Sequence, residues 1–177
     1  WLTCRKQYHY AFVDGLTPNE VSIPLERGTL GHEAFSRYCQ CVIDGGTHEQ
    51  AIREGHTAFN ESLAAGILPM DTVMETKTIW DRYMAYHNGF PQWELLGTEQ
   101  RVDLVISEEL IIPMRYDLLV RDKASNKVLV VDFKFTYNFW SPNDHDRNVQ
   151  LAKYIVILNS VGIKCDGYIL EEVRTRK

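Results

Sequence analysis

The chain carries two kinds of hydrophobic pattern, one in each half. Up to residue 90, apolar side chains recur at the 3.6-residue spacing of amphipathic helices. Three helices are predicted in this half: 29–43, 47–65 and 71–88. From residue 91 onward, short apolar runs rich in β-branched residues indicate strands, and one helical pattern interrupts them. The elements predicted in this half are strands over 95–106, 110–121, 127–135 and 166–171, with a helix over 146–161 before the last strand.

This order of elements predicts an α/β fold. A helix that crosses between strands favours a mixed central β-sheet flanked by helices. Residues 1–90 would form an N-terminal, mainly helical part, and residues 91–177 would form the sheet core. A chain of 177 residues is expected to make one domain. Residues 15–28 are expected to be a connector, because Pro18 and Pro24 interrupt regular structure there.

Two charges stand inside the most apolar predicted strand, 127–135. Asp132 and Lys134 are two residues apart, so their side chains leave the same face of the strand. Burying each charge costs several kcal/mol unless it is paired or bound to something. These two residues therefore form either a structural ion pair or part of a binding site.

The polar segment before this strand predicts a hairpin turn, and the turn predicts a register. If 123–126 is the loop, Asp122 faces Lys127, and antiparallel pairing then places Asp117 opposite Asp132 on one face. Directly opposed like charges destabilise a sheet, and a divalent cation between the two carboxylates would remove that repulsion. The alternative is an Asp132–Lys134 ion pair with Asp117 in solvent, and the hairpin alone does not choose between them.

Two predicted helices carry further candidates. His32 shares an apolar stripe with Phe35 and Cys39, where a lone histidine is more often a core residue than a ligand. Gln150 and Tyr154 are four residues apart, so they are stacked on one face of the later helix.

The charge balance argues against a broadly basic nucleic-acid surface. The formal net charge is −5, whereas nucleic-acid-binding surfaces are usually basic. An acidic metal site inside a locally basic groove would escape that argument. The candidate basic residues for such a groove are Arg5, Lys6, Arg115, Arg147 and Lys153.

Compartment and partners are constrained by two absences in the sequence. No apolar run approaches the roughly 20 residues that span a bilayer, so no membrane partner is expected. The 4 cysteines lack the spacing of a metal finger, and a reducing, cytoplasmic compartment is the simplest interpretation.

Taken in chain order, the candidates form a known arrangement. His32 in a helix is followed by Asp117, then by Asp132-Phe133-Lys134, and then by Gln150 and Tyr154. This order resembles the PD-(D/E)XK nucleases, in particular the RecB-like exonuclease branch. That branch includes the RecB and AddAB nuclease domains, CRISPR-associated RecB-like exonucleases and phage enzymes. The Asp-x-Lys motif alone is weak, but the full set in this order is specific.

The resemblance implies a restriction-endonuclease-like core and a metal-dependent deoxyribonuclease, expected to be an exonuclease in recombination, repair, CRISPR or phage DNA processing. It implies one or two Mg²⁺ or Mn²⁺ ions held by His32, Asp117, Asp132 and the main-chain carbonyl of Phe133. Hard oxygen ligands suit these ions.

The same resemblance assigns Lys134 as the catalytic lysine, which would act on the attacking water or on the developing charge. It places Gln150 and Tyr154 against the site or the nucleic-acid backbone. Single-stranded DNA or duplex ends are the implied substrate, and a helicase, recombination or CRISPR-associated protein is a candidate partner.

Three more residues are secondary candidates for the site. Glu99 is a polar member of the first predicted strand, and Tyr137 and Trp140 follow the Asp-x-Lys strand, where they either stack on bases or pack under a loop. Some members of the branch carry a four-cysteine iron–sulfur cluster. Here only Cys165 lies late in the chain, so such a cluster is not supported within these residues.

Two functions remain open at this stage. One is the metal-dependent nuclease, and the other is a non-catalytic module that binds DNA or a protein on the same fold. The motif positions all keep chemically competent residues, which favours the enzyme.

Overall fold

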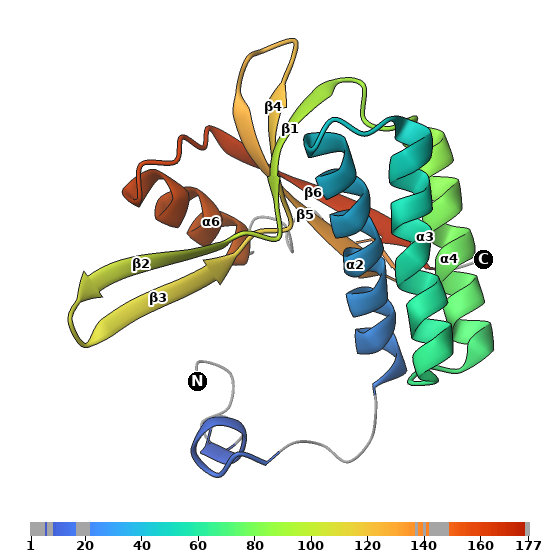
Figure 1. Cartoon of the computed structure of the whole chain (residues 1–177). Helices are drawn as coiled ribbons and strands as arrows, with labels where there is room; N and C mark the ends of the chain where they lie inside the picture. The colour runs from blue at the N-terminus through green and yellow to red at the C-terminus, as the bar shows by residue number, and fades with distance from the viewer. Residues whose placement is uncertain are drawn as a thin grey trace.

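A computed structural model describes Lys6 and residues 9–16, 22–136, 138–139, 141 and 149–175. Its helical elements are a single π-helical turn η1 (His9–Val13) and the helices α2 (Ile23–Ile43), α3 (His48–Ala65), α4 (Met70–His87) and α6 (Val149–Ser160). Its strands are β1 (Trp93–Thr98), β2 (Arg101–Ser107), β3 (Leu110–Arg115), β4 (Leu118–Asp122), β5 (Val128–Thr136) and β6 (Gly167–Arg174). Figure 1 shows them in chain order.

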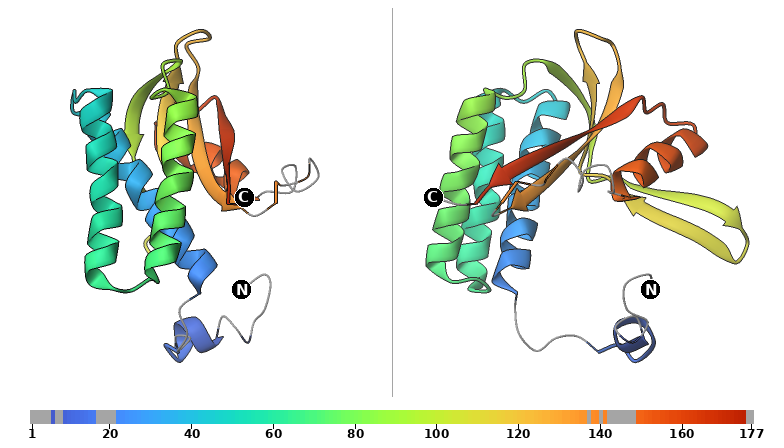
Figure 2. Two further views of the ribbon diagram at one scale, coloured as in Figure 1. Left: turned by 90° about the vertical axis from the view of Figure 1, so that its right-hand side faces the viewer. Right: turned by 180° about the vertical axis from the view of Figure 1, so that it is seen from behind.

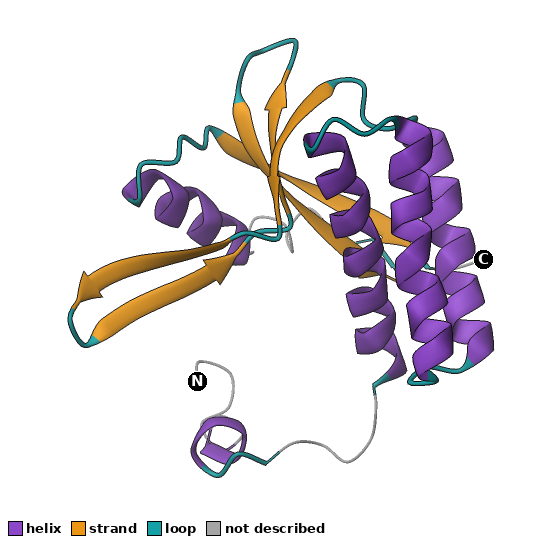
Figure 3. Cartoon of the chain, in the orientation of Figure 1, coloured by secondary structure: helices purple, strands orange, loops and turns teal. Residues whose placement is uncertain are grey.

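Four strands form a mixed sheet in the order β1-β4-β5-β6. The pairs β1–β4 and β4–β5 are antiparallel, whereas β5 and β6 are parallel and are connected through α6. Strands β2 and β3 pair only with each other, as a ribbon that projects from the sheet (Figures 1 and 3). The expected α/β class, a mixed sheet flanked by helices with an N-terminal helical part, is confirmed.

Helices lie on both faces of the sheet (Figure 2), and the sheet separates two hydrophobic cores, one on each face. Helices α2 and α4 contact one face and α3 packs against these two helices. Phe35 of α2 stacks there on Phe133 of β5, with ring centroids 4.2 Å apart. Helix α6 covers the other face, where its Leu158 is fully buried in a core that includes Val130. The helical part and the sheet therefore share one continuous packing interface. None of the described helices is both long and apolar enough to cross a bilayer.

The hairpin register predicted from the turn is confirmed. Leu118 pairs with Val131 and Leu119 pairs with Val130, and Asp122 N donates to Lys127 O over 2.9 Å. These pairs alternate between the two cores, as the two-residue period of a strand requires. Asp117 and Asp132 would be the next pair in this register, but β4 begins only at Leu118 and the strand pairing does not extend to them.

Two of the predicted strands are each divided into two. The strand expected over 95–106 is interrupted at Glu99 and Gln100, and the one over 110–121 is interrupted at Tyr116 and Asp117. The breaks face each other, because Glu99 N donates to Asp117 O over 3.0 Å. Glu99 has φ 49°, a left-handed conformation that is uncommon for glutamate and that ends the strand. Beyond the breaks, the two segments leave the four-stranded sheet and pair with each other as the β2–β3 ribbon.

The helices differ from expectation mainly at their starts. Helix α2 begins at Ile23 and not at residue 29, and its first turn includes Pro24. Proline is tolerated there because the first backbone N–H groups of a helix have no partner within it. The second helix is confirmed, with Thr47 and Gln50 forming its capping box. The helix expected over 146–161 is described from Val149, and its first predicted residues lie outside the described part.

Close packing of α2 on β5 depends on Gly31. A Cβ atom at this position would lie 2.1 Å from ring atoms of Phe135, which no side chain tolerates without movement. We expect Gly31→Ala to lower the free energy of unfolding by ~1–3 kcal/mol, the usual range for overpacking. Gly28→Ala in the same helix meets nothing within 4 Å, and we expect it to be neutral or stabilising by up to ~1 kcal/mol. Urea unfolding of both variants measures the difference, and equal stability would contradict the packing argument.

Candidate metal centre and catalytic cleft

A cleft of about 650 Å³ opens where α2, the two strand breaks, β5 and α6 meet. Six of the ten site residues predicted from the sequence line it. They are His32 from α2, Glu99 and Asp117 from the breaks, Lys134 from β5, and Gln150 and Tyr154 from α6. Segments far apart in the chain thus deliver their polar side chains to one place.

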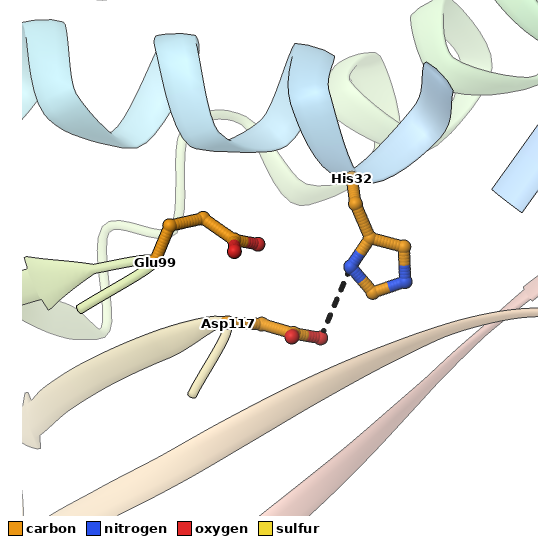
Figure 4. A group of neighbouring side chains, drawn as sticks. All are labelled: His32, Glu99 and Asp117. Carbon is orange, nitrogen blue, oxygen red and sulfur yellow. Dashed lines mark ion pairs between the residues drawn. The ribbon is translucent and has the colours of Figure 1, made fainter. Parts of the chain in front are cut away.

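Three of these residues form a cluster with the composition of a metal site (Figure 4). One ligand atom each from His32, Glu99 and Asp117 lies within 4.8 Å of the others. His32 Nδ1 is 3.2 Å from Asp117 Oδ2, and both side chains are partly buried. The cluster includes Glu99, which the sequence marked only as a secondary candidate.

The strand breaks position Asp117. Its backbone oxygen accepts hydrogen bonds from Thr98 Oγ1 over 2.8 Å and from Glu99 N over 3.0 Å. Its carboxylate Oδ2 accepts a hydrogen bond from Phe133 N over 2.8 Å. Asp117 is therefore held at both its main chain and its side chain, with the carboxylate directed at His32 (Figure 4).

His32 lies at the end of the apolar stripe predicted for its helix. Phe35 and Cys39 of that stripe are 2% and 0% exposed, whereas the His32 side chain is 26% exposed. Its ring is therefore at the edge of the core, where it borders the cleft and not the interior.

Asp132 belongs to an adjoining group on the face of β5 that α6 covers. It is 1% exposed, and its Oδ1 accepts hydrogen bonds from Lys134 over 3.1 Å, Tyr154 over 3.2 Å and Gln150 over 3.3 Å. Gln150 also donates to the Tyr154 hydroxyl. The sequence placed Asp132 together with His32 and Asp117. The structure instead brings Glu99 into the cluster of three, because Asp117 turns toward α2 while Asp132 is held beneath α6.

Phe133 connects the two groups. Its N–H donates a hydrogen bond to the Asp117 carboxylate. Its neighbours in sequence are Asp132 and Lys134, which belong to the other group. The N–H and C=O of one strand residue point to the same edge, so the Phe133 carbonyl leaves β5 on the side of Asp117. The ligand role expected for that carbonyl stays a prediction.

The pKa shifts of the carboxyl groups show that negative charge is crowded here. Burial raises the pKa of Asp132, and the charge of Asp117 raises it further, against the opposing hydrogen bond from Lys134. Burial and the charge of Asp117 likewise raise the pKa of Glu99. For His32, burial lowers the pKa, but the hydrogen bond to Asp117 and its charge outweigh burial, and the net pKa is raised. An added cation would relieve the repulsion that Asp117 exerts on Asp132 and on Glu99.

The donor set fits a divalent cation. Two carboxylates and one imidazole suit Mn²⁺, and the carboxylates also suit Mg²⁺. In addition, Asp132 Oδ2 is buried and lies 2.8 Å from Lys134 Nζ in an ion pair, yet it accepts no hydrogen bond of good geometry from the described residues. His32, Glu99 and Asp117 would hold such an ion, with the Phe133 carbonyl and Asp132 beside them.

The cleft is not uniformly basic. Arg115 and Lys134 are the cationic residues among its described lining, which also includes the carboxylates of Glu33, Glu99 and Asp117. Of the other basic candidates, Lys153 contacts the Pro113 carbonyl and Lys6 lies over the Tyr10 ring. Arg5, Arg147, Tyr137 and Trp140 lie outside the described residues.

Comparisons with known proteins identify no family for the chain. No protein-family model matches it, and no curated protein matches it in sequence. Among solved structures, it is similar to the crystal structure of protein VC1899 from Vibrio cholerae, with a TM-score of 0.34 and 13% sequence identity. That alignment covers 88% of this chain and 44% of the other, so the chain spans less than half the length of that protein. A TM-score this low does not establish a shared fold.

Proposed function

We propose that the protein is a metal-dependent nuclease that hydrolyses DNA phosphodiester bonds. The observation that carries this proposal is the meeting of His32, Glu99 and Asp117 in a cleft that also exposes Lys134. Phosphodiester hydrolysis needs charge neutralisation at the phosphate and an activated water. A divalent cation, when bound, supplies both.

Lys134 is the residue best placed to act on the reacting groups. Its side chain is 26% exposed and lines the cleft, while Nζ is held 2.8 Å from Asp132 Oδ2. Asp132 is itself fixed by Gln150 and Tyr154. The ammonium group is therefore held in a fixed position. A preorganised positive charge of this kind is what stabilisation of a developing negative charge requires. A deprotonated Lys134 could instead take a proton from the attacking water.

The sequence resemblance to RecB-like PD-(D/E)XK exonucleases supports the same reaction. The Asp-x-Lys motif lies on β5, an inner strand of the sheet, next to the break that carries Asp117. We extend the proposal to digestion from DNA ends, in the cytoplasm, within recombination, repair, CRISPR or phage DNA processing. A helicase or CRISPR-associated protein is the kind of partner that would supply single strands or open ends.

The test is a cleavage assay on end-labelled linear single- and double-stranded DNA, with Mn²⁺ or Mg²⁺ and with EDTA. We expect short labelled products with metal and none with EDTA. A closed circular substrate of the same sequence distinguishes digestion from ends, which leaves it intact, from internal cleavage. Matched RNA tests the choice of nucleic acid.

The outcomes separate the two functions left open by the sequence. Metal-dependent binding of DNA without any cleavage would overturn the enzyme and favour the non-catalytic module. Absence of both binding and cleavage would overturn both readings that involve DNA.

A further inference from the structure

Two arginines face each other across the base of the β2–β3 ribbon. Arg101 and Arg115 are direct Cα partners in the antiparallel pairing, so their side chains leave the same face. Both side chains are 69% exposed. Directly opposed like charges destabilise a pair of strands, and a two-stranded ribbon has little stability to spare. The juxtaposition is therefore unfavourable unless negative charge, from carboxylates or from a bound anion, offsets it.

Each arginine has a carboxylate partner in the structure, but the two partners differ. Arg101 Nε is 2.8 Å from Oδ1 of Asp103 on the same ribbon. Arg115 Nε is 3.0 Å from Oε2 of Glu99, whose side chain is 24% exposed. Glu99 also belongs to the cluster with His32 and Asp117. Arg115 and a metal ion therefore compete for the same carboxylate.

The position of Arg115 matches what a phosphate-binding residue needs. It is the last residue of β3, directly before the break that carries Asp117, and it lines the same cleft as Lys134. The ribbon continues away from the sheet beyond it (Figure 1). A guanidinium presents a planar fork of donors that fits two phosphate oxygens, which a lysine does not.

We infer that Arg115, together with Arg101, binds the phosphate backbone of a DNA strand at the cleft, and that Glu99 holds Arg115 away from DNA until a cation takes Glu99. This inference rests on the proposed function, because it names how the same site holds its substrate. It requires positive coupling: metal binding strengthens DNA binding, and DNA strengthens metal binding by the same factor.

The test measures DNA binding without metal, so it does not depend on catalysis. Fluorescence anisotropy of a labelled single-stranded oligonucleotide in EDTA is compared for the wild type, Glu99→Gln and Glu99→Gln/Arg115→Gln. We expect Glu99→Gln to bind about tenfold more tightly, because Arg115 is released to make a charge-assisted bond to phosphate. The slope of log affinity against log salt concentration should become steeper by the amount that corresponds to about one additional phosphate contact. The double variant should lose both gains.

Glu33→Gln is the matched control. Glu33 also lines the cleft, but it pairs with Arg37 of its own helix and not with Arg115. Removing its charge should strengthen DNA binding only slightly, and adding Arg115→Gln should not abolish that small change. If Glu33→Gln gains as much affinity as Glu99→Gln and loses it equally on adding Arg115→Gln, the effect is one of net charge. The proposed clamp, in which Glu99 holds Arg115 away from DNA, is then wrong; it is also wrong if the double variant at Glu99 and Arg115 keeps the full gain.

Calorimetry with Mn²⁺ alone supplies the second readout. Competition for Glu99 predicts that Arg115→Gln binds Mn²⁺ several-fold more tightly than the wild type, whereas weaker or equal binding would overturn the competition. The clamp and the proposed function fail separately. If the wild type cleaves DNA but Glu99→Gln/Arg115→Gln still binds DNA as tightly as Glu99→Gln, the clamp alone is overturned. If the variants bind DNA as expected but the wild type cleaves none, the nuclease alone is overturned. Failure of every variant to bind DNA at low salt overturns the clamp.

Discussion

Replacing Asp117 with asparagine is expected to abolish metal binding and to lower nuclease activity by ~10³-fold or more. A bound divalent ion contributes several kcal/mol of charge stabilisation to phosphoryl chemistry, and each 1.4 kcal/mol corresponds to about tenfold in rate. The asparagine oxygen can still accept the hydrogen bond from Phe133 N, so the local backbone should be preserved. What is lost is the negative charge beside His32 and Glu99.

Thermal unfolding with and without Mn²⁺ measures the binding part of this prediction. At a metal concentration of about 100 times Kd, binding stabilises the folded state by about 2.7 kcal/mol. For a chain of this size, that corresponds to a rise in Tm of about 5–10 °C. We expect this rise for the wild type and not for Asp117→Asn.

Asp81→Asn is the matched control for Asp117→Asn. Asp81 also pairs with a histidine, His56, at 2.6 Å, but on helices α3 and α4 and outside the cleft. This variant should keep the metal-dependent rise in Tm and the nuclease activity. A rise in Tm for Asp117→Asn equal to that of the wild type would remove Asp117 from the metal site.

The hairpin at the centre of the sheet could be predicted from sequence because its information is local. A four-residue polar turn fixes which residues pair, and the strict two-residue period then fixes the faces. The observed pairing of Leu118 with Val131 follows from that turn alone. The α/β class follows equally from local patterns, since helical and strand periods differ.

The strand breaks could not be predicted from the same patterns. Alternation of apolar and polar residues continues through the break at Tyr116 and Asp117, and the polar run at the other break, 98–101, contains no glycine or proline, so the sequence resembles two long strands. The interruption depends on a left-handed backbone at Glu99 and on the hydrogen bond from Glu99 N to Asp117 O, two residues that lie 18 positions apart in sequence. A non-glycine residue with positive φ is uncommon and has no composition signal in this segment.

The break also explains why the sequence pattern indicates Asp132 as a site residue more strongly than Glu99. An acidic residue inside a predicted strand gives no indication that the strand ends there and turns its side chain toward a distant helix. Asp132 was prominent because it interrupts a long apolar run, and that run correctly predicted its burial. Burial, however, also places it beneath α6, where Gln150 and Tyr154 satisfy one of its oxygens.

Lys134→Ala separates catalysis from metal binding. A protonated lysine has no lone pair to offer, so Lys134 is not a ligand even though it lies beside the candidate centre. If it serves the attacking water or the charged transition state, its removal should lower the cleavage rate by ~10²-fold or more, the usual scale for such groups. Metal affinity should change little or rise, because a neighbouring positive charge is removed. Asp117→Asn should lose both properties.

The measurement pairs Mn²⁺ calorimetry with cleavage assays on each variant, after circular dichroism has shown that the variant is folded. Lys134 opposes the burial that raises the pKa of Asp132, so we expect its removal to raise that pKa further, and all variants are compared at one alkaline pH. Lys127→Ala is the control, because Lys127 is exposed and precedes the same strand at its other end. We expect Lys127→Ala to cleave at the wild-type rate. If Lys134→Ala also does, then Lys134 is only the structural partner of Asp132 in a buried ion pair.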